Sequence, residues 1–224
     1  MGLKSVPLKT KSSVEKQNIT IKIITFAFYQ MELKEKQKKI LDVAVELFKE
    51  KGYMGSSVRD LATKLNIKAA SLYAHIRSKE EILEWICFGI AQEFFDELQE
   101  VKNTSIPPKE KLNLFIDKHL SVVLKNRDVT HIYSNEWKHL EERLPEFIAL
   151  RKNYQQEVEE LISEIYRAEN WELRSSSFTT RFILHTLNNS YFWFKRNTES
   201  TSEITDEIRD KILYGLLGKV SSKS

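Results

Sequence analysis

The chain has 224 residues, 41% of them hydrophobic and 30% charged, a composition that excludes a collagen-like, membrane-embedded or generally disordered protein. Its six glycines and four prolines are too few for a β-sandwich or barrel, in which turns recur every ~8–12 residues, so long helices are favoured. The single cysteine, Cys87, excludes an internal disulfide and favours a reducing compartment, so we expect a cytoplasmic protein.

Charge is distributed unevenly along the chain. Residues 1–30 carry five lysines and one acidic side chain, and residues 31–79 carry eleven basic and six acidic ones. Residues 80–224 instead carry nineteen basic and twenty-five acidic side chains. The basic N-terminal third is therefore the part that we expect to contact a polyanion.

Residues 1–30 are expected to form an N-terminal extension. Their longest apolar stretch, 19–29, is interrupted by Lys22 and is shorter than the ~20 residues that cross a bilayer. It is not followed by the small-x-small pattern of a signal-peptide cleavage site. Two interpretations remain open: Met31 is the true start, or the extension is a basic arm that contacts DNA phosphates.

The first two predicted helices lie between residues 34 and 65. Apolar residues recur at three- and four-residue spacings over 34–51, which predicts an amphipathic helix that ends at Gly52. Ser57, with Asp60 three residues later, has the pattern of an N-cap and predicts a short second helix through Leu65.

A tight turn is predicted directly after this second helix. Asn66 tolerates the positive φ of such a turn, and Ile67 is expected to pack inward before a third short helix over 68–75. Two short helices joined by a tight turn form a helix-turn-helix motif.

The rest of the chain is predicted to be helical as well. Ser78, with Glu81 in capping-box spacing, starts a long helix to about Val101. Asp128 is expected to cap a later helix. Further helices are expected over 107–125, 128–139, 143–168, 175–195 and 203–217. We therefore predict an all-α fold of about nine helices, with a helix-turn-helix domain over 31–79 and a helical bundle over 80–224.

The stretch GYMGSSVRDLATKLNIKAASLYAHIRSKEEIL, residues 52–83, resembles the DNA-binding domain of TetR-type transcriptional regulators. It has the Gly-Tyr pair, the Ser cap, an Asp-Leu-Ala triplet, Leu-Tyr-x-His-Ile and Ser-Lys-Glu in order. It departs from the pattern at Asn66 and Ala70, where glycine is frequent. The resemblance implies a homodimer that binds a palindromic double-stranded DNA operator until a small-molecule effector releases it.

The resemblance also indicates which residues meet DNA. The major groove admits one helix, whose short exposed face meets base edges while flanking groups bind phosphates. That face is expected at Lys68, Ala69, Ala70 and Ser71. The resemblance assigns phosphate contacts to Ser57, Tyr73, His75 and Lys79, and less directly to Arg59 and Arg77. The alternatives are a half-buried aromatic for Tyr73 and a helix cap for His75.

Residues 80–224 would form the ligand-binding and dimerisation domain. The stretch 135–140, with Arg151, Tyr154, Leu187-Asn188 and Trp193-Phe194, resembles the TetR branch that senses acyl-CoA thioesters. Aromatic and polar residues on these helices are candidates for lining an apolar cavity with a few orienting polar groups: Trp85, Phe88, Phe115, His119, His131, Tyr133, Trp137, Tyr154, His185, Asn188 and Tyr191. The alternative for each is ordinary core packing. Arg151 and Lys152 are candidates for the CoA phosphates, or else solvated surface charges.

The last two predicted helices are candidates for the dimer interface. By the same resemblance, two helices from each subunit pair as a four-helix interface, and a two-fold dimer matches symmetric half-sites. The alternative is packing within one subunit. The candidate residues are Phe182, Leu187, Phe194, Ile208, Ile212 and Leu216.

We do not expect an enzyme, a metal or a cofactor. The sequence has no GxxxxGK, GxGxxG or GxSxG motif, and Cys87 lies in an apolar helical run, where an inert buried thiol is expected. Glu136-x-x-His139 and Asp128-x-x-His131 lie on one predicted helix, so they cannot face each other across a di-iron bundle. Two other functions stay open: a multidrug-sensing efflux repressor, for which Glu136 could supply the buried acid, and a helical binding module without DNA.

Overall fold

The computed structural model describes residues 33–170, 175–193 and 201–217. Within these ranges the chain forms nine α-helices, two short 3₁₀-helices and no strand, which confirms the predicted all-α fold. The expectations for residues 1–30 lie outside the described residues. None of the described helices is long and apolar enough to cross a membrane.

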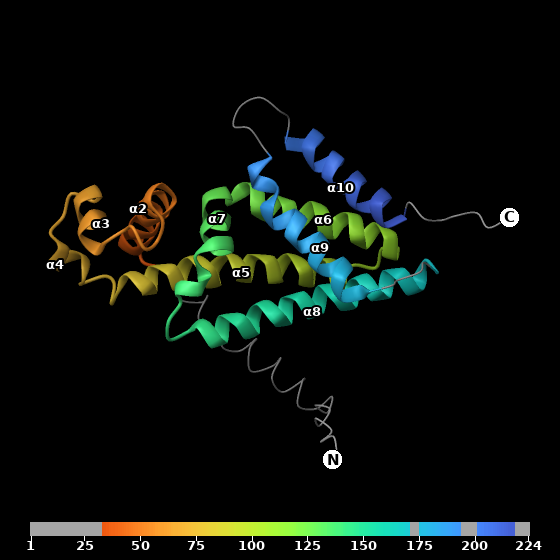
Figure 1. Ribbon diagram of the computed structural model, residues 1–224, viewed down its shortest axis with the longest axis horizontal. Coiled ribbons are helices and arrows are strands. Elements are labelled where there is room, and N and C mark those ends of the chain that lie inside the picture. Colours follow the sequence, from red (N-terminus) through yellow and green to blue (C-terminus); the bar gives the residue numbers. More distant parts are fainter. Residues whose placement is uncertain (1–32, 171–174, 194–200, 218–224) are drawn as a thin grey trace, which may run out of the picture.

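The molecule is elongated, with a small three-helix head at one end and a bundle of longer helices beyond it (Figure 1). The head consists of α2 (Glu35–Lys51), α3 (Val58–Lys64) and α4 (Ala69–Leu72). The body consists of α5 (Lys79–Asn103), α6 (Pro108–Lys125), α7 (Arg127–Asn135), α8 (Leu144–Ala168), α9 (Ser176–Asn189) and α10 (Thr201–Leu217), with the 3₁₀-helices η1 (Trp137–His139) and η2 (Ser190–Phe192).

Local chemistry explains where the head helices begin and end. α2 stops at Gly52, whose φ of 72° lies in a region that other residues avoid. α3 starts at Ser57, whose hydroxyl accepts the Asp60 N–H at 3.1 Å. Asn66 makes the turn before α4 with a φ of 54°. All three positions were predicted from the sequence.

Two expectations for the head are wrong in detail. Ile67 does not pack inward, since it is 40% exposed. Its N–H donates to the Ala62 carbonyl at 3.0 Å, so the turn holds its backbone, rather than its side chain, against α3. The helix expected over 68–75 is also shorter and spans only Ala69–Leu72.

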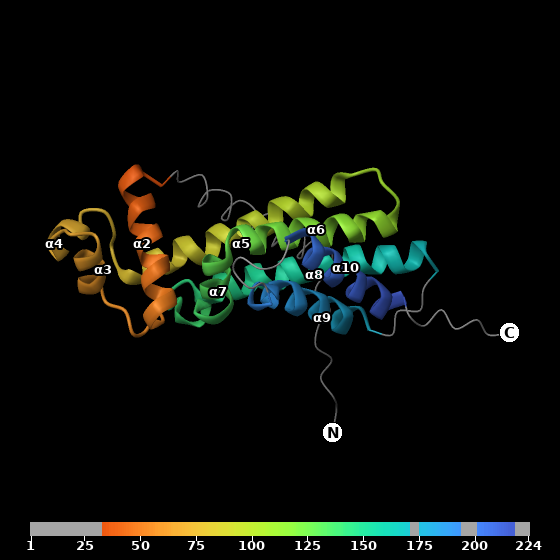
Figure 2. The same ribbon diagram turned by 90° about the horizontal axis from the view of Figure 1, so that it is seen from above.

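α5 connects the head to the body and runs through the middle of the molecule (Figures 1 and 2). It begins after Ser78, whose hydroxyl accepts the Glu81 N–H at 3.1 Å, as the capping-box spacing predicted. Its residues at four-residue spacing, including Ile82, Ile86 and Phe94, are buried. One side of this helix is therefore buried along most of its length, and the helix joins the head to the body.

The segment after α6 differs from the prediction. Asp128 is not the cap of α7, which begins at Arg127; its carboxylate instead contacts the Lys49 ammonium of α2 at 2.8 Å. The helix expected over 128–139 is divided at Glu136 into α7 and η1. Likewise α9 ends at Asn189 and is followed by η2, and residues 194–195 lie outside the described residues.

Candidate nucleic-acid interface and effector site

The short helix α4 presents a small exposed face at the tip of the head. Lys68, Ala70 and Ser71 are exposed and Ala69 is half-buried, whereas Leu72 is fully buried. α4 is thus fixed by its buried side against the head core, and its outer face carries only short or cationic side chains. Such a face fits the major groove, because a helix there must approach base edges closely.

Three of the proposed phosphate contacts already have partners within the protein. The Ser57 hydroxyl donates to the Asp60 carboxylate, and Arg77 contacts Glu81 at 3.1 Å. The Lys79 ammonium donates to the backbone carbonyls of Tyr53 and Ser56, both at 2.8 Å. These contacts shape the head, so binding a phosphate would require each group to share or exchange its partner.

The other candidates are available to an external anion. Within the described residues, the side chains of Arg59, Lys68 and Tyr73 make no hydrogen bond or ion pair, and all three are exposed. His75 is half-buried, and its carbonyl accepts a hydrogen bond from the Gln37 amide of α2 at 3.3 Å. Arg59 and Lys68 are therefore exposed cations of the head that have no ion pair among the described residues, whereas the exposed Arg77 is paired with Glu81.

Asp60 stabilises the start of α3 as an ionised carboxylate. Hydrogen bonds from the Ser57 hydroxyl and the Lys51 ammonium lower the pKa of Asp60 to about 2. The carboxylate also accepts the Ser57 N–H at 2.9 Å, which completes a capping box. This local network positions Ser57 and the exposed turn of α3 that follows it.

Most of the predicted effector residues form two clusters in the body, and the rings of Phe94 and Tyr133, 5.8 Å apart, join these clusters. One is centred on His119 of α6, which is 2% exposed. Its Nδ1 lies 3.0 Å from the Tyr154 hydroxyl, its Nε2 lies 3.1 Å from Asn188 Oδ1, and its ring stacks on Phe94. Burial lowers the pKa of His119 to about 4, so the imidazole is neutral at pH 7. Phe115 packs against the same ring.

A second cluster surrounds Arg151 of α8. Its guanidinium lies 5.2 Å from the centre of the Tyr133 ring and 4.9 Å from that of Trp137. Phe147 contacts both aromatic rings. Phe88 extends this cluster, because its ring packs on Phe147 and lies 3.9 Å from the Arg143 guanidinium.

The remaining candidates lie apart from these two clusters or at the surface. Trp85 is buried, with no partner for its indole N–H among the described residues. Tyr191 is bonded to His131 of α7 at 3.0 Å. His185 is exposed on α9, so it does not line an interior cavity in the protomer. Lys152 is exposed as well.

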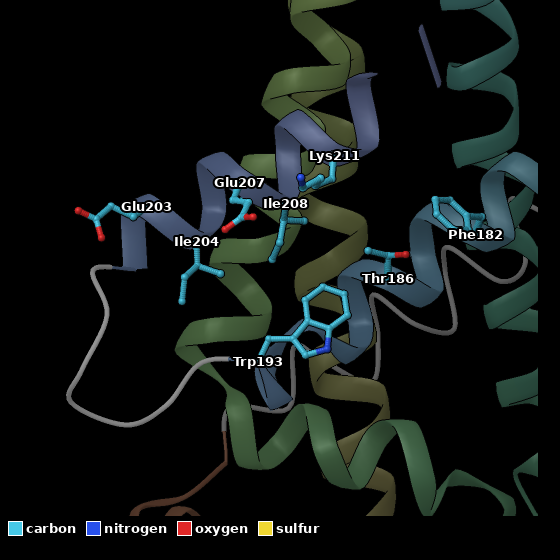
Figure 3. Close-up of a pocket in the computed structure, with 8 residues that line it drawn as sticks. All are labelled: Phe182, Thr186, Trp193, Glu203, Ile204, Glu207, Ile208 and Lys211. Carbon is cyan, nitrogen blue, oxygen red and sulfur yellow. The ribbon is translucent and has the colours of Figure 1, made fainter. Parts of the chain in front are cut away.

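Large apolar side chains are exposed along α9 and at its C-terminal end. Phe178 and Phe182 of α9, Phe192 of η2 and Trp193 after it are each more than half exposed. Between α9 and α10 lies a groove of about 660 Å³ (Figure 3), lined by Phe182, Thr186, Trp193, Glu203, Ile204, Glu207, Ile208 and Lys211. Sequence reasoning missed Phe178 and Phe192 here, although the four-residue spacing of Phe178 and Phe182 would have indicated a shared face.

The predicted interface residues are only partly on this face. Phe182 is exposed, but Leu187 is fully buried, and Ile208 and Ile212 are at most 5% exposed within the protomer. This placement assigns Leu187 to the core of the protomer. Phe194 and the side chain of Leu216 lie outside the described residues.

The side chains that were considered for metal binding or catalysis lie in ordinary structural contacts. Glu136 contacts His139 at 3.4 Å, and the described residues contain no group of three or more metal-ligating side chains. Cys87 is fully buried, which raises the pKa of its thiol.

Comparison with known proteins gives the family. A model described as "Bacterial regulatory proteins, tetR family" matches residues 40–86, and one described as "Tetracyclin repressor-like, C-terminal domain" matches residues 105–216. The HTH-type transcriptional repressor KstR2 of Rhodococcus jostii (strain RHA1) is 29% identical over 105 residues, 47% of this chain and 52% of that protein. The negative regulator IcaR of the Staphylococcus aureus (strain Newman) biofilm operon is 44% identical over 71 residues, 30% of this chain and 38% of that protein.

Solved structures resemble the chain over most of its length. The TetR family regulator PfmR from Thermus thermophilus superposes with a TM-score of 0.70 at 29% identity, over 79% of this chain and 98% of that one. AibR in complex with isovaleryl coenzyme A and operator DNA superposes with a TM-score of 0.67 at 24% identity, over 80% and 96%. The chain spans about half the length of the KstR2 repressor that it matches. Both family models describe transcriptional regulators, and the relatives named above are transcriptional regulators rather than enzymes. The chain belongs to the TetR family of bacterial regulators.

Proposed function

We propose that the chain is a cytoplasmic, homodimeric repressor that binds a palindromic operator and leaves it when a small organic effector binds in the body. Residues 31–79 would read DNA, and residues 80–224 would bind the effector and form the dimer. The observation that carries the proposal is the outer face of α4, where exposed Lys68, Ala70 and Ser71 stand at the tip of the head.

Phosphate contacts would supply most of the DNA affinity. Alanines contact thymine methyl groups and serine bonds several bases, so the recognition face carries little sequence information by itself. Arg59 and Lys68 are exposed and without an ion pair among the described residues. Their cations would displace counterions from DNA, which makes binding strongly salt-dependent.

The exposed face of α9, with the groove beside α10, supports a dimer through these two helices. Large exposed apolar patches mark interaction surfaces, and Phe182 and Trp193, which are 51% and 53% exposed, line this groove. A two-fold axis here would place two heads on one face of DNA, which suits half-sites about 34 Å apart.

The charges inside the body favour an anionic effector. The buried carboxylates Glu81, Glu84 and Glu157 each have a cationic partner within 4 Å. Glu136, the acid that a multidrug sensor would use, already contacts His139 at 3.4 Å. An acyl-CoA thioester fits this pattern better than a lipophilic cation does, and the same fold binds isovaleryl coenzyme A in AibR.

The proposed mechanism is a population shift. The effector would bind more tightly to a conformation in which α5 moves the two heads out of major-groove register. α5 suits this role because its first turn contacts the head, where Lys79 is bound to the Tyr53 carbonyl, and one side of the remaining helix is buried in the body.

Fluorescence anisotropy on DNA from upstream of its own gene tests the DNA function. We expect saturable binding that weakens with salt, and a loss of binding in Tyr73→Ala, with an unchanged circular dichroism spectrum because Tyr73 is 54% exposed. A folded Tyr73→Ala variant with unchanged affinity would remove Tyr73 from the interface. Absence of binding by the wild type at low salt would contradict the proposal.

A further inference from the structure

The guanidinium of Arg151 occupies an unusual position in the body. It projects from α8 between the rings of Tyr133 and Trp137, 5.2 Å and 4.9 Å from their centres. Aromatic faces attract a guanidinium, but they satisfy none of its five N–H donors. The two rings therefore hold the cation in place and leave its hydrogen-bonding edge unused.

Arg151 differs in this respect from comparable arginines of the body. Arg143 contacts Glu84 and Glu146, and Arg209 contacts Asp117 and Asp206. Within the described part of the chain, no ion pair or hydrogen bond involves Arg151, and its Nη1 is buried without a partner. A buried donor without an acceptor destabilises a fold, and a charged one does so more strongly.

The neighbours of Arg151 do not supply the missing negative charge. The thiol of Cys87 and the hydroxyl of Tyr133 are close enough to interact electrostatically with the guanidinium, and both are neutral because burial raises the pKa of each. The carboxylate of Glu136 contacts His139 instead. The site thus has a cation and the half-buried ring of Trp137, against which the buried Phe147 packs, but no anion of its own among the described residues.

We propose that Arg151 is the anion-binding residue of the effector site and takes an oxyanion of an organic effector, a carboxylate or a phosphate. A planar guanidinium binds such groups through two parallel hydrogen bonds. The apolar part of the effector would pack on Trp137, which is half-buried. This assignment rests on the proposed function only in calling the ligand an effector, because binding of the anion itself requires no DNA.

Occupation of this site would act directly on the junction with the head. Trp137 and His139 are the two ends of the 3₁₀-helix η1. His139 stacks on Tyr53 of the head, with ring centres 5.4 Å apart. An effector held between Arg151 and Trp137 would therefore shift the same turn that supports the head.

Thermal unfolding with and without ligands tests the assignment. The probes are inorganic phosphate, a series of short straight- and branched-chain carboxylates, and the coenzyme A thioesters of these acids. Comparing the free acids with their thioesters shows whether Arg151 binds a carboxylate or a phosphate of coenzyme A. We expect at least one probe to raise the Tm of the wild type, and Arg151→Met to weaken that probe's binding on the order of tenfold to a hundredfold. Lys152→Met, which removes the adjacent exposed cation, should keep the wild-type response.

The Tm without ligand separates a binding role from a structural one. If Arg151 serves a ligand, Arg151→Met removes an unsatisfied buried donor, so its Tm should equal or exceed that of the wild type. A variant that is unfolded or has a lower Tm, or one that keeps the full ligand response, would overturn the assignment. So would a wild type that responds to none of the probes. Operator binding by wild type and Arg151→Met is measured separately without ligand. A protein that binds the anion but no operator would refute the proposed DNA function and leave the assignment of Arg151 intact.

Discussion

The rings of Tyr53 and His139 are stacked across the junction between head and body, with centres 5.4 Å apart and planes 21° from parallel. Tyr53 follows α2 of the head, and His139 ends η1 of the body. The Lys79 ammonium also lies over the Tyr53 ring, 4.0 Å from its centre. Tyr53 is thus in contact with two elements of the body, the first turn of α5 and η1.

Replacing His139 with alanine should weaken the coupling between effector and DNA. We expect operator affinity without effector to change little, and the effector-induced loss of affinity, roughly 5- to 150-fold in allosteric proteins, to shrink severalfold. Stability should fall by about 1 kcal/mol with the loss of the ring contact. Anisotropy titrations with and without effector measure the coupling. Lys138→Ala, an exposed neighbour on η1, is the matched control, and a coupling equally reduced there would rule out the ring contact as the cause.

Removing the Lys68 ammonium should lower the salt dependence of operator binding. Because Lys68 is exposed beside α4, we expect Lys68→Ala to weaken binding to all sequences and to reduce the slope of log affinity against log salt by about 1 per subunit. Lys64→Ala serves as the control, since Lys64 contacts Glu50 at 2.9 Å and is occupied within the head. Equal slopes for wild type and Lys68→Ala would show that Lys68 does not touch a phosphate.

A carboxylate at position 182 should separate the subunits. Phe182→Glu places a third acid in the groove that already contains Glu203 and Glu207, so it should disfavour a two-fold contact through α9 and α10 by desolvation and repulsion. Sedimentation velocity should give a monomer for Phe182→Glu and a dimer for the wild type. The control is Lys152→Glu, an exposed charge reversal on α8. A dimeric Phe182→Glu protein with normal DNA affinity would place the interface elsewhere.

Burial of His119 should make stability depend on pH in a defined window. Its pKa is about 4 in the folded protein, lowered by desolvation from 6.5, so the unfolded chain binds the extra proton between these two values. The contribution of neutral His119 is thus complete above pH 6.5 and declines as the pH falls towards 4. From pH 7 to pH 5 this loss amounts to about 2 kcal/mol.

Urea unfolding at these two pH values provides the measurement. His119→Gln lacks the titrating group, so the difference between its free energies of unfolding at pH 7 and pH 5 should be smaller than that of the wild type by this amount. Equal differences in the two proteins would mean that His119 is able to take up its proton while folded.

The positions that the sequence could predict are those decided by local backbone chemistry. The cap at Ser57 and the turn at Asn66 depend on residues within three or four positions, so the sequence pattern contains what is needed. Asp128 shows the limit of this approach: its preference for a cap position is outweighed by an ion pair with Lys49, which is far away in the chain.

For the effector site and the dimer face, the sequence indicated which kinds of residue take part but not where their side chains lie. α9 is apolar on two sides, so its periodicity does not indicate that Leu187 faces the core while Phe182 faces outward. The arrangement of Arg151 between Tyr133 and Trp137 joins α8 to α7 and η1. Such a contact depends on how whole helices pack, and spacing along the chain carries no information about it.

Control of DNA binding by an effector in the body is tested by an anisotropy titration of the operator complex with the anion that raises the Tm of the wild type. We expect this anion to dissociate the wild-type complex at concentrations that saturate the free protein, while the complex of Arg151→Met persists. Dissociation of both complexes at the same anion concentration, or of neither, would contradict this expectation.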